Sequence, residues 1–558
     1  MATTLITALA GTAALALAAT KGRARLALSR AKHGSLTGHV RMAKRIAGQI
    51  PFYDYDEHRF FRADDAPDDM AERRRAGFMR LSALYAERYA KTRALTAEAR
   101  TGLSDLQFTG AYRVPFQFSR IVREHLGTGA FLASSEGPIV TDLDGNRFHD
   151  LTGSYGVNLF GYDAYKRMIA EGAATVAALG PVLGAYHPIV ADNVRRLKAI
   201  SKLDEISFHM SGTEAVMQAV RLARYHTRRK RVVRFAGAYH GWWGDVQPGI
   251  GNPVPADGTL TLAEMSDATL RVLARRRDIA CVLVNPLQAL HPNSGAPADS
   301  ALIDSSRKAG FDRAAYADWL HRLAAVCKAS GIVLIFDEVF VGFRLAPGGA
   351  AEYFGVAPDM ITYGKTLGGG LPVGVLCGRA ALMKRYRDDR PVDICFARGT
   401  FNAHPYVMGA MDAFLRDLET PAVRALYEGL DVRWDARAAL LNARLAAADL
   451  PVRIAHLSTI WTITYTLPSR YNWMLQYYLR AEGLALSWVG TGRLIFSLDY
   501  DDDAFALVID RFAAAAAKMR EDGWWWQAPG ITNKALRRQV LRETLRVRLG
   551  GKADQAAA

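Results

Sequence analysis

The chain has few cysteines, and they form no metal-binding or disulfide pattern. Its 558 residues contain four cysteines, none in a C-x-x-C pair and none beside a histidine cluster. This spacing argues against a disulfide framework and predicts no structural zinc or other metal site. Scattered thiols suit a reducing compartment, so we expect the body of the protein to be cytoplasmic.

The sequence also lacks a dinucleotide-binding fingerprint and any nucleic-acid-binding module. No G-x-G-x-x-G follows a predicted strand with an acidic residue about 20 positions later. The net charge of +16 comes mainly from the two ends: residues 1–50 carry eight bases and no acid, and residues 531–558 have a net charge of +5. The long middle is nearly balanced, so we predict no nucleic-acid partner.

Residues 2–20 carry no charge and are about long enough to cross a bilayer as a helix. Positive charge follows this run instead of preceding it, which differs from a cleaved signal peptide and places the body in the cytoplasm. Residues 21–47 set apolar side chains between bases, a pattern suited to an anionic membrane surface. We predict a membrane anchor here; a helix packed on the body and a cleaved targeting segment are the alternatives.

From about residue 110, strand-like apolar runs alternate with helical patterns. The stretch "GPIVTDLDGNRFHDL" (137–151) alternates around Asp-Gly and predicts a β-hairpin. We expect strands within 231–237, 279–286, 331–339 and 359–365, and helices over 163–180, 214–227, 267–278 and 314–330. This alternation predicts an α/β fold with a mostly parallel sheet, whose ligands bind at the carboxyl ends of the strands.

A further strand before residue 210, and the strand within 231–237, are followed by residues suited to a flat, phosphorylated ligand. Ser211, Gly212 and Thr213 open a helix and offer backbone N–H groups and hydroxyls to a phosphate, although Ser211 with Glu214 also fits an ordinary N-cap. Tyr239 follows the next strand on a glycine-flanked loop, where its ring can stack on a flat ligand.

The other two strand ends carry a carboxylate and an amine. Asp337 ends a buried run, where it needs a partner such as a protonated ring nitrogen or an arginine. Lys365, in "YGKTLGGGLPVG" (363–374), can form a Schiff base, or hold a phosphate or an ion pair. A phosphate anchor, a stacking ring, a carboxylate and an amine together are what pyridoxal phosphate requires. The three glycines after Lys365 are expected to let the backbone pass close to the cofactor and a partner subunit.

Five stretches in order make the chain similar to a known family. They are "SGTEAVMQAVRLAR" (211–224), "FAGAYHGWWGD" (235–245), "LIFDEVFVGFR" (334–344), "YGKTLGGGLPVGVLCG" (363–378) and "RGTFNAHPYVMGAM" (398–411). The chain resembles the class III pyridoxal-phosphate aminotransferases, in their glutamate-1-semialdehyde aminomutase-like branch, over roughly 110–520. The resemblance implies fold type I: a large, mostly parallel-sheet domain and a smaller α+β domain, here with a helical N-terminal extension.

The resemblance, with the composition of the ends, divides the chain into six parts. They are a predicted membrane-anchor and basic helix (1–50), a helical extension (51–109), the N-terminal part of the small domain (110–162), the large cofactor-binding domain (163–404), the C-terminal small domain (405–526) and a basic tail (527–558).

The resemblance also implies roles for the site residues. Lys365 holds pyridoxal phosphate as a Schiff base and moves the substrate proton, while Asp337 pairs with the ring nitrogen. Val339 and Tyr239 pack on opposite faces of the ring. The remaining cofactor contacts implied are Ser211, Gly212 and Thr213 at the phosphate, with Thr400 reaching the phosphate of the neighbouring subunit. That last contact implies a homodimer.

The implied activity is transfer of an amino group from a donor to an aldehyde or ketone by a ping-pong Schiff-base mechanism. Tyr155 and Arg493 are candidate substrate contacts; Arg493 suits a carboxylate, or is a surface arginine on a strand edge. An intramolecular aminomutase acting on an amino-aldehyde is the alternative within the family. A non-catalytic membrane-associated scaffold is the alternative of another class.

Overall fold

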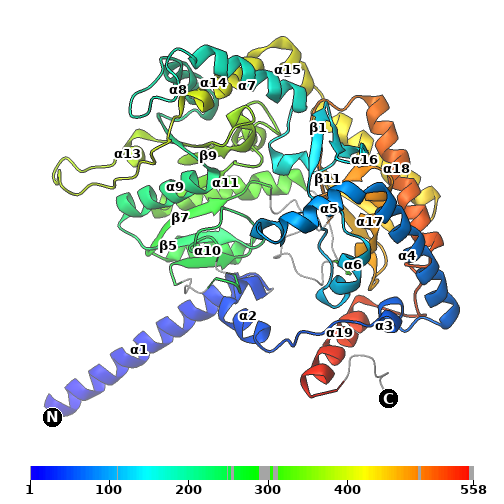
Figure 1. Ribbon diagram of the computed structural model, residues 1–558. Helices are drawn as coiled ribbons and strands as arrows, with labels where there is room; N and C mark the ends of the chain where they lie inside the picture. The colour runs from blue at the N-terminus through cyan, green and yellow to red at the C-terminus, as the bar shows by residue number, and fades with distance from the viewer. Residues whose placement is uncertain are drawn as a thin grey trace.

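A seven-stranded sheet forms the centre of the largest part of the molecule (Figure 1). The computed structural model describes residues 2–551 except 35, 108, 110, 248, 253–256, 288–301, 304, 306–311 and 488–491, and describes side chains from residue 13 onward except Thr37. The strands are β4 (Glu205–His209), β5 (Arg231–Phe235), β6 (Thr259–Leu262), β7 (Ile279–Val284), β8 (Val333–Asp337), β9 (Met360–Gly364) and β10 (Gly374–Gly378). They confirm the strands predicted within 231–237, 279–286, 331–339 and 359–365.

The sheet order is β4-β10-β9-β8-β7-β5-β6. Strand β10 runs antiparallel to both of its neighbours, and the other pairs are parallel. Every residue of β7, β8, β9 and β10 is buried. A sheet covered on both faces needs continuous apolar strands, which is why these runs do not alternate in the sequence.

Helices pack on and around this sheet. They are α7 (Tyr162–Val176), α8 (Ile189–Ser201), α9 (Gly212–Thr227), α10 (Asp267–Arg275), α11 (Arg313–Ser330), α12 (Gly349–Phe354), α13 (Ala380–Met383) and α14 (Pro405–Glu419). They confirm the helices predicted near 163–180, 214–227, 267–278 and 314–330. Helix α14 packs along α7 and α8, so the chain that follows residue 404 still contributes a helix to this unit. The approach to α7 is close: a Cβ added at Gly172 would lie 2.3 Å from the backbone nitrogen of Ala410.

A second unit combines residues that precede the large sheet in the sequence with residues that follow it. One sheet has the order β1-β2-β3-β13, and another has the order β11-β12-β14. The strands are β1 (Leu132–Glu136), β2 (Ile139–Asp142), β3 (Arg147–Asp150), β11 (Val452–Leu457), β12 (Ile460–Tyr465), β13 (Leu484–Ala485) and β14 (Arg493–Ile495). The helices are α6 (Ser119–His125), α15 (Pro421–Tyr427), α16 (Leu430–Ala447), α17 (Leu475–Ala481) and α18 (Asp502–Glu521). The antiparallel pair β2–β3 confirms the predicted hairpin, and β13 joins β3 in parallel.

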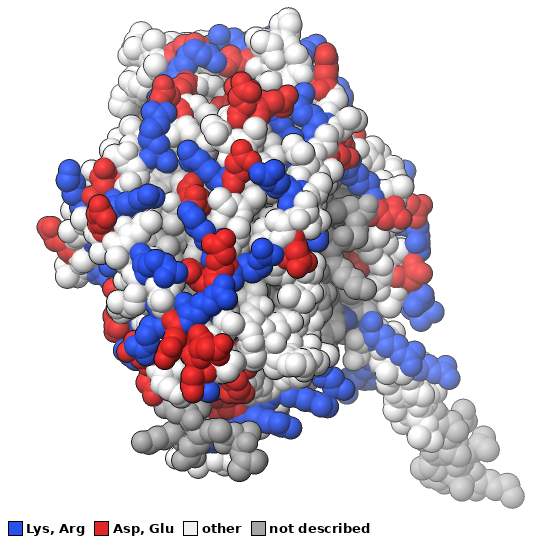
Figure 2. Space-filling model, turned by 90° about the vertical axis from the view of Figure 1, so that its right-hand side faces the viewer, with Lys and Arg blue, Asp and Glu red and all other residues white. Residues whose placement is uncertain are grey.

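The N-terminal extension begins with a long helix that projects from the body (Figure 1). Its helices are α1 (Ala2–Ala31), α2 (Val40–Ala47), α3 (Glu57–Phe61), α4 (Asp68–Arg88) and α5 (Ala90–Ala99). The end of α1 is fixed on the large unit, where the carbonyl of Ala31 accepts a hydrogen bond from the backbone N–H of Ala263 at 2.9 Å. Leu15 and Leu17 on the projecting part are exposed, and Figure 2 shows basic side chains on the part of this helix nearer the body.

A search of the described residues finds no helix long and apolar enough to cross a membrane. The side chains of residues 2–12 lie outside that description. They make up more than half of the anchor predicted over residues 2–20, which therefore stays a prediction.

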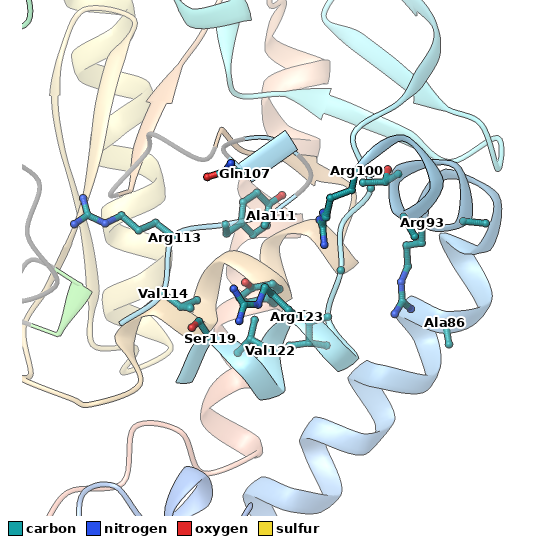
Figure 3. A pocket seen from close by; sticks show the side chains of 18 of the residues that line it. Ala86, Arg93, Arg100, Gln107, Ala111, Arg113, Val114, Ser119, Val122 and Arg123 are labelled. Carbon is teal, nitrogen blue, oxygen red and sulfur yellow. The ribbon is translucent and has the colours of Figure 1, made fainter. Parts of the chain in front are cut away.

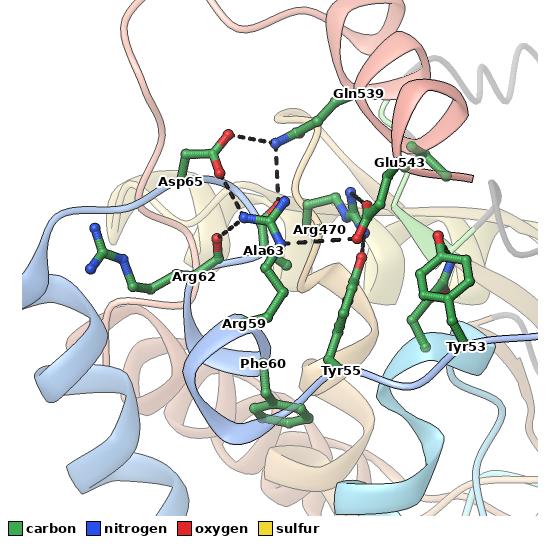
Figure 4. A network of polar contacts seen from close by, with 12 residues as sticks. Tyr53, Tyr55, Arg59, Phe60, Arg62, Ala63, Asp65, Arg470, Gln539 and Glu543 are labelled. Atoms are coloured by element: carbon green, nitrogen blue, oxygen red, sulfur yellow. Dashed lines mark hydrogen bonds and ion pairs between the residues drawn. The ribbon is translucent and has the colours of Figure 1, made fainter. Parts of the chain in front are cut away.

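The basic C-terminal stretch is not a simple tail, because it forms α19 (Asn533–Arg548) and docks on the body. Figure 4 shows its contact: the buried carboxylate of Glu543 lies 3.3 Å from both terminal nitrogens of the buried Arg470 guanidinium. Arg59 Nε lies 3.9 Å from the other carboxylate oxygen, and Arg470 also donates to the Tyr55 hydroxyl. Helix α19 thus joins the N-terminal extension to the C-terminal part of the second unit.

Candidate active site

Asp337 is the last residue of β8, and its buried carboxylate is held on both oxygens. Oδ2 lies 2.7 Å from His240 Nδ1, while Oδ1 accepts from the Val339 backbone N–H and the Thr362 hydroxyl, each at 3.2 Å. The other ring nitrogen of His240 is buried and makes no hydrogen bond to a described residue. These contacts fix the carboxylate at the carboxyl edge of the sheet, where a ligand of a parallel sheet is expected.

Lys365 directly follows β9, the neighbour of β8, with a backbone φ of 49°. Its Nζ lies 5.6 Å from the centre of the Phe340 ring. A Cβ added at Gly156 would lie 2.6 Å from that ring and 3.4 Å from Lys365 Cδ, so Gly156 leaves the room that the lysine side chain occupies.

Burial lowers the pKa of the Lys365 amine below its usual 10.5. Asp337 opposes this effect, and the Arg493 and Arg344 guanidinium groups add to it. A lowered pKa gives more neutral amine at a given pH, and the neutral amine is the form that attacks a carbonyl.

The turn at the start of α9 has a complete N-cap. The Ser211 hydroxyl accepts from the Glu214 backbone N–H at 3.3 Å, and the Glu214 carboxylate accepts from the Met210 backbone N–H at 2.9 Å. The N-cap interpretation of Ser211 therefore describes its contacts, while the Glu214 side chain binds the residue before the cap. The cap leaves other N–H groups of the first turn without intrahelical acceptors, which is the general basis for binding a phosphate there.

The helix start, the aromatic loop and the end of β8 pack tightly together. A Cβ added at Gly212 would lie 2.6 Å from a Val339 methyl group, and one added at Gly241 would lie 2.6 Å from the Thr213 hydroxyl. A Cβ at Gly374 would lie 1.9 Å from the Ser211 carbonyl oxygen. Only hydrogen in place of a side chain permits these approaches.

Gly369, in the glycine triplet after Lys365, approaches a helix of its own chain, whereas the triplet was expected to approach the cofactor and a partner subunit. Gly369 has a φ of 59°, and a Cβ there would lie 2.3 Å from the carbonyl oxygen of Ala410 in α14. Gly369 therefore permits close packing on a helix of the same chain.

The candidate substrate residues lie beside this cluster. The Arg493 guanidinium carbon is 5.6 Å from the centre of the Phe340 ring, the same ring that Lys365 approaches. Tyr155 precedes Gly156, is half-exposed, and has a left-handed φ of 58°. A non-glycine residue held in this region is strained, and such strain occurs often at functional sites.

Thr400 is the one predicted cofactor contact that lies apart from this cluster. It is exposed in the segment between α13 and α14, which extends away from the body (Figure 1). This segment carries exposed large hydrophobic side chains: Tyr386, Val392, Ile394, Phe396 and Phe401.

Sequence reasoning missed three residues that shape the site. His240 adjoins Tyr239, and a buried carboxylate at residue 337 requires a partner. The pairing of His240 with Asp337 could therefore have been considered from the sequence. Phe340 follows Asp337 by three residues but carried no chemical signal. Arg344 is buried and donates to the Asn158 carbonyl at 3.0 Å and the Phe496 carbonyl at 2.6 Å, which ties the two units beside Lys365.

The residues present fit the predicted pyridoxal phosphate. The set contains a partly buried amine with a lowered pKa, a fixed buried carboxylate and a helix start with a hydroxyl. The Tyr239 ring is 57% exposed, which leaves it available for stacking. The glycine positions around Val339 and Thr213 keep the walls of the cluster close to the backbone.

Comparison with known proteins agrees with this chemistry. The model of the family "Aminotransferase class-III" matches residues 122–515. A glutamate-1-semialdehyde 2,1-aminomutase of Alkaliphilus oremlandii (strain OhILAs) is 35% identical over 317 residues, covering 53% of this chain and 69% of the relative. The enzyme of that name from Roseiflexus castenholzii (strain DSM 13941 / HLO8) is 32% identical over 380 residues, covering 67% and 82%.

Solved structures share the fold. A transaminase with bound pyridoxal phosphate has a TM-score of 0.64 at 24% identity, covering 78% of this chain and 99% of its own. A glutamate-1-semialdehyde aminomutase from Pseudomonas aeruginosa PAO1 has a TM-score of 0.63 at 19% identity, covering 80% and 99%. The fold is therefore fold type I, as expected.

Proposed function

The chain belongs to the class III aminotransferases, which are pyridoxal-phosphate enzymes, and we propose that it moves an amino group from an amino donor to an aldehyde or ketone in a ping-pong cycle. The observation that carries this proposal is the Lys365 amine, its pKa lowered by burial, together with the fixed Asp337 carboxylate, whose charge acts on that amine. An amine and a carboxylate placed in this way are suited to hold such a cofactor at its two reactive positions.

Each site residue then has a separable task. When bound, pyridoxal phosphate supplies an electron sink for negative charge on the substrate carbon. Lys365 Nζ would hold the cofactor covalently and carry a proton to and from that carbon. Asp337 would keep the ring nitrogen protonated, and His240 positions Asp337 through its 2.7 Å contact.

The remaining residues would bind and orient. Thr213 and the first turn of α9 would hold the phosphate, with Ser211 and Gly212 shaping the turn. Tyr239 and Val339 would lie on the two faces of the ring. Arg493 would receive a substrate carboxylate beside Phe340, and Tyr155 would line the entrance.

An intramolecular aminomutase is the second candidate, because the two relatives described above carry that name. An aminomutase needs no separate amino donor. The two candidates therefore differ in whether the product forms from one compound or only from two.

A spectroscopic screen tests the proposal. We expect an amino donor alone to convert the absorbance of the bound cofactor to that of its amine form, and a carbonyl acceptor added later to restore it. Turnover of a single amino-aldehyde without any donor would instead support the aminomutase. A purified protein with no cofactor absorbance would contradict both enzymes and favour the scaffold.

We further propose a homodimer in which Thr400 reaches the partner's phosphate. The exposed side chains Val392 and Phe396 on the projecting segment support this, since large apolar groups in a cluster often mark an interface. Light scattering should give twice the chain mass. A monomeric mass for the active protein would contradict the proposal.

We also propose that the N-terminus holds the protein at the inner face of a membrane. The support is the uncharged run 2–20, the exposed Leu15 and Leu17, and the bases that follow, which complement anionic lipid. Deleting residues 2–20 should release the chain from the membrane fraction. An unchanged distribution between the soluble and membrane fractions would contradict it.

Arg493 should also influence the chemistry through charge. It is one of the groups that lower the pKa of Lys365, so Arg493→Gln should raise that pKa toward 10.5. Since the amine reacts when deprotonated, the pH midpoint for capture of pyridoxal phosphate by the cofactor-free protein should move upward. Arg271→Gln, an exposed arginine on α10, is the control and should leave the midpoint in place. Equal midpoints for both variants would show that Arg493 does not act on Lys365.

A further inference from the structure

A cavity of about 660 Å³ lies between the N-terminal extension and the second unit (Figure 3), and none of the residues assigned to the cofactor lines it. Its lining comes from α5 and the end of α4, from the segment 107–119, from α6, and from Tyr477 of α17. Most of this lining precedes residue 122, where the match to the family model begins. The volume lies within the range of small-molecule sites.

The walls of this cavity are largely apolar. Ala90, Ala94 and Ala97 lie at a spacing that places them on one face of α5, and Ala86, near the end of α4, lines the cavity as well. Val114, Val122 and Leu126 are among the residues that complete the wall. Alanine side chains are short, so the face that they form leaves room between the elements.

The charged side chains that line the cavity are all positive. Four arginines line the cavity, Arg93, Arg100, Arg113 and Arg123, and the described lining contains no Asp or Glu. Figure 3 shows the Arg100 and Arg123 guanidinium groups turned toward the space between α5 and α6. Within the described part of the chain neither group forms an ion pair, so both are available to an anion.

A buried polar group adds to this lining. Tyr112 lines the cavity and is 5% exposed, and its hydroxyl has no hydrogen bond to a described residue. The hydroxyl lies near the Arg480 guanidinium without the geometry of a hydrogen bond to it. A buried hydroxyl left in this way is costly unless a ligand or water meets it.

We propose that this cavity binds an amphipathic anion, with an oxyanion head group at Arg100 and Arg123 and an apolar body along the alanine face. Guanidinium groups suit both carboxylates and phosphate monoesters, and the shared chemistry is one oxyanion joined to a hydrocarbon chain. The site is separate from the cofactor, so its occupation does not depend on the proposed transamination.

Calorimetric titration of the full-length holoenzyme tests this proposal with four probes, with the two charged amphiphiles kept below their micellar concentrations and dodecanol below its solubility limit. Dodecanoate and dodecyl phosphate should each bind once per chain, and their relative affinities identify the preferred head group. Dodecanol should bind at least tenfold more weakly because it lacks charge, and inorganic phosphate should give no measurable binding because it lacks the chain.

Variants locate the binding. Arg100→Gln with Arg123→Gln should weaken dodecanoate at least tenfold, whereas the matched pair Arg271→Gln with Arg275→Gln on α10 should change it less than twofold. Ala94→Trp should abolish binding by filling the cavity, with the absorbance of the bound cofactor unchanged as evidence of folding. Absence of binding by both amphiphiles, equal binding of dodecanol, or full affinity in the Arg100/Arg123 double variant would each overturn the proposal.

Discussion

Replacing Lys365 by alanine is expected to reduce turnover by at least about 10⁴-fold, because one substitution removes both covalent attachment and proton transfer. The chain should stay folded, since Lys365 lies partly buried beside Gly156 and Phe340 and contributes little to the core. Steady-state rates and the absorbance of bound cofactor measure the two effects separately. The absorbance should change, because cofactor held without Nζ is bound only by polar and stacking contacts.

A lysine outside the site provides the control. Lys328 is exposed in the last turn of α11, and Lys328→Ala should keep the rate within a factor of two. Residual transamination above a hundredth of the normal rate in Lys365→Ala, with an intact fold, would show that another group carries the proton. The assignment of Lys365 would then be wrong, although membership of the family would stand.

Much of the fold was predictable because strands buried on both faces require apolar residues at every position. Strands β7, β8 and β9 are buried along their whole length, and each appears as a continuous apolar run. Parallel neighbours end at one edge, so the sequence alone predicts that a carboxylate after β8 and an amine after β9 lie close together. Neither inference depends on how the side chains pack.

The partner of Asp337 could not be predicted in the same way. A buried carboxylate demands a partner, but the choice among arginine, histidine and ligand depends on where the loop after β5 lies. The 2.7 Å contact from His240 exists because Gly241 lets that loop approach Thr213. Such an approach depends on packing between segments far apart in sequence, which a single chain does not reveal.

The C-terminal helix was missed for a related reason. Residues 527–558 carry many bases, and a basic end with no apolar run looks like a tail. Only Leu536 and Glu543 of α19 are buried, and the burial of Glu543 is stabilised by Arg470, which lies 73 residues earlier. The apolar side chains that face the core, Leu536, Val540 and Val547, are few and lie among many bases, so they form only a weak helical pattern in the sequence.

That ion pair leads to the second large prediction. Glu543→Ala should weaken the docking of α19 by about 3–5 kcal/mol, because it leaves the buried Arg470 guanidinium without its carboxylate. Hydrogen exchange of the α19 amides in the holoenzyme should accelerate by about 10²- to 4 × 10³-fold, since each 1.4 kcal/mol corresponds to a factor of about ten. The amides of β8 should keep their protection, because the large sheet does not depend on this contact.

The exposed pair Arg322–Asp318 gives the matched comparison, with a separation of 3.9 Å and side-chain exposures of 48% and 70%. Asp318→Ala should alter exchange in α11 by less than twofold, as is usual for a solvated pair. Replacing both buried partners, Arg470→Met with Glu543→Leu, should restore much of the protection lost in Glu543→Ala, because no uncompensated charge remains at that position. If the double variant exchanges as fast as Glu543→Ala, the helix is held by the specific polar contacts of the Glu543 carboxylate with Arg470 and Arg59 and not by the cost of an unpaired charge.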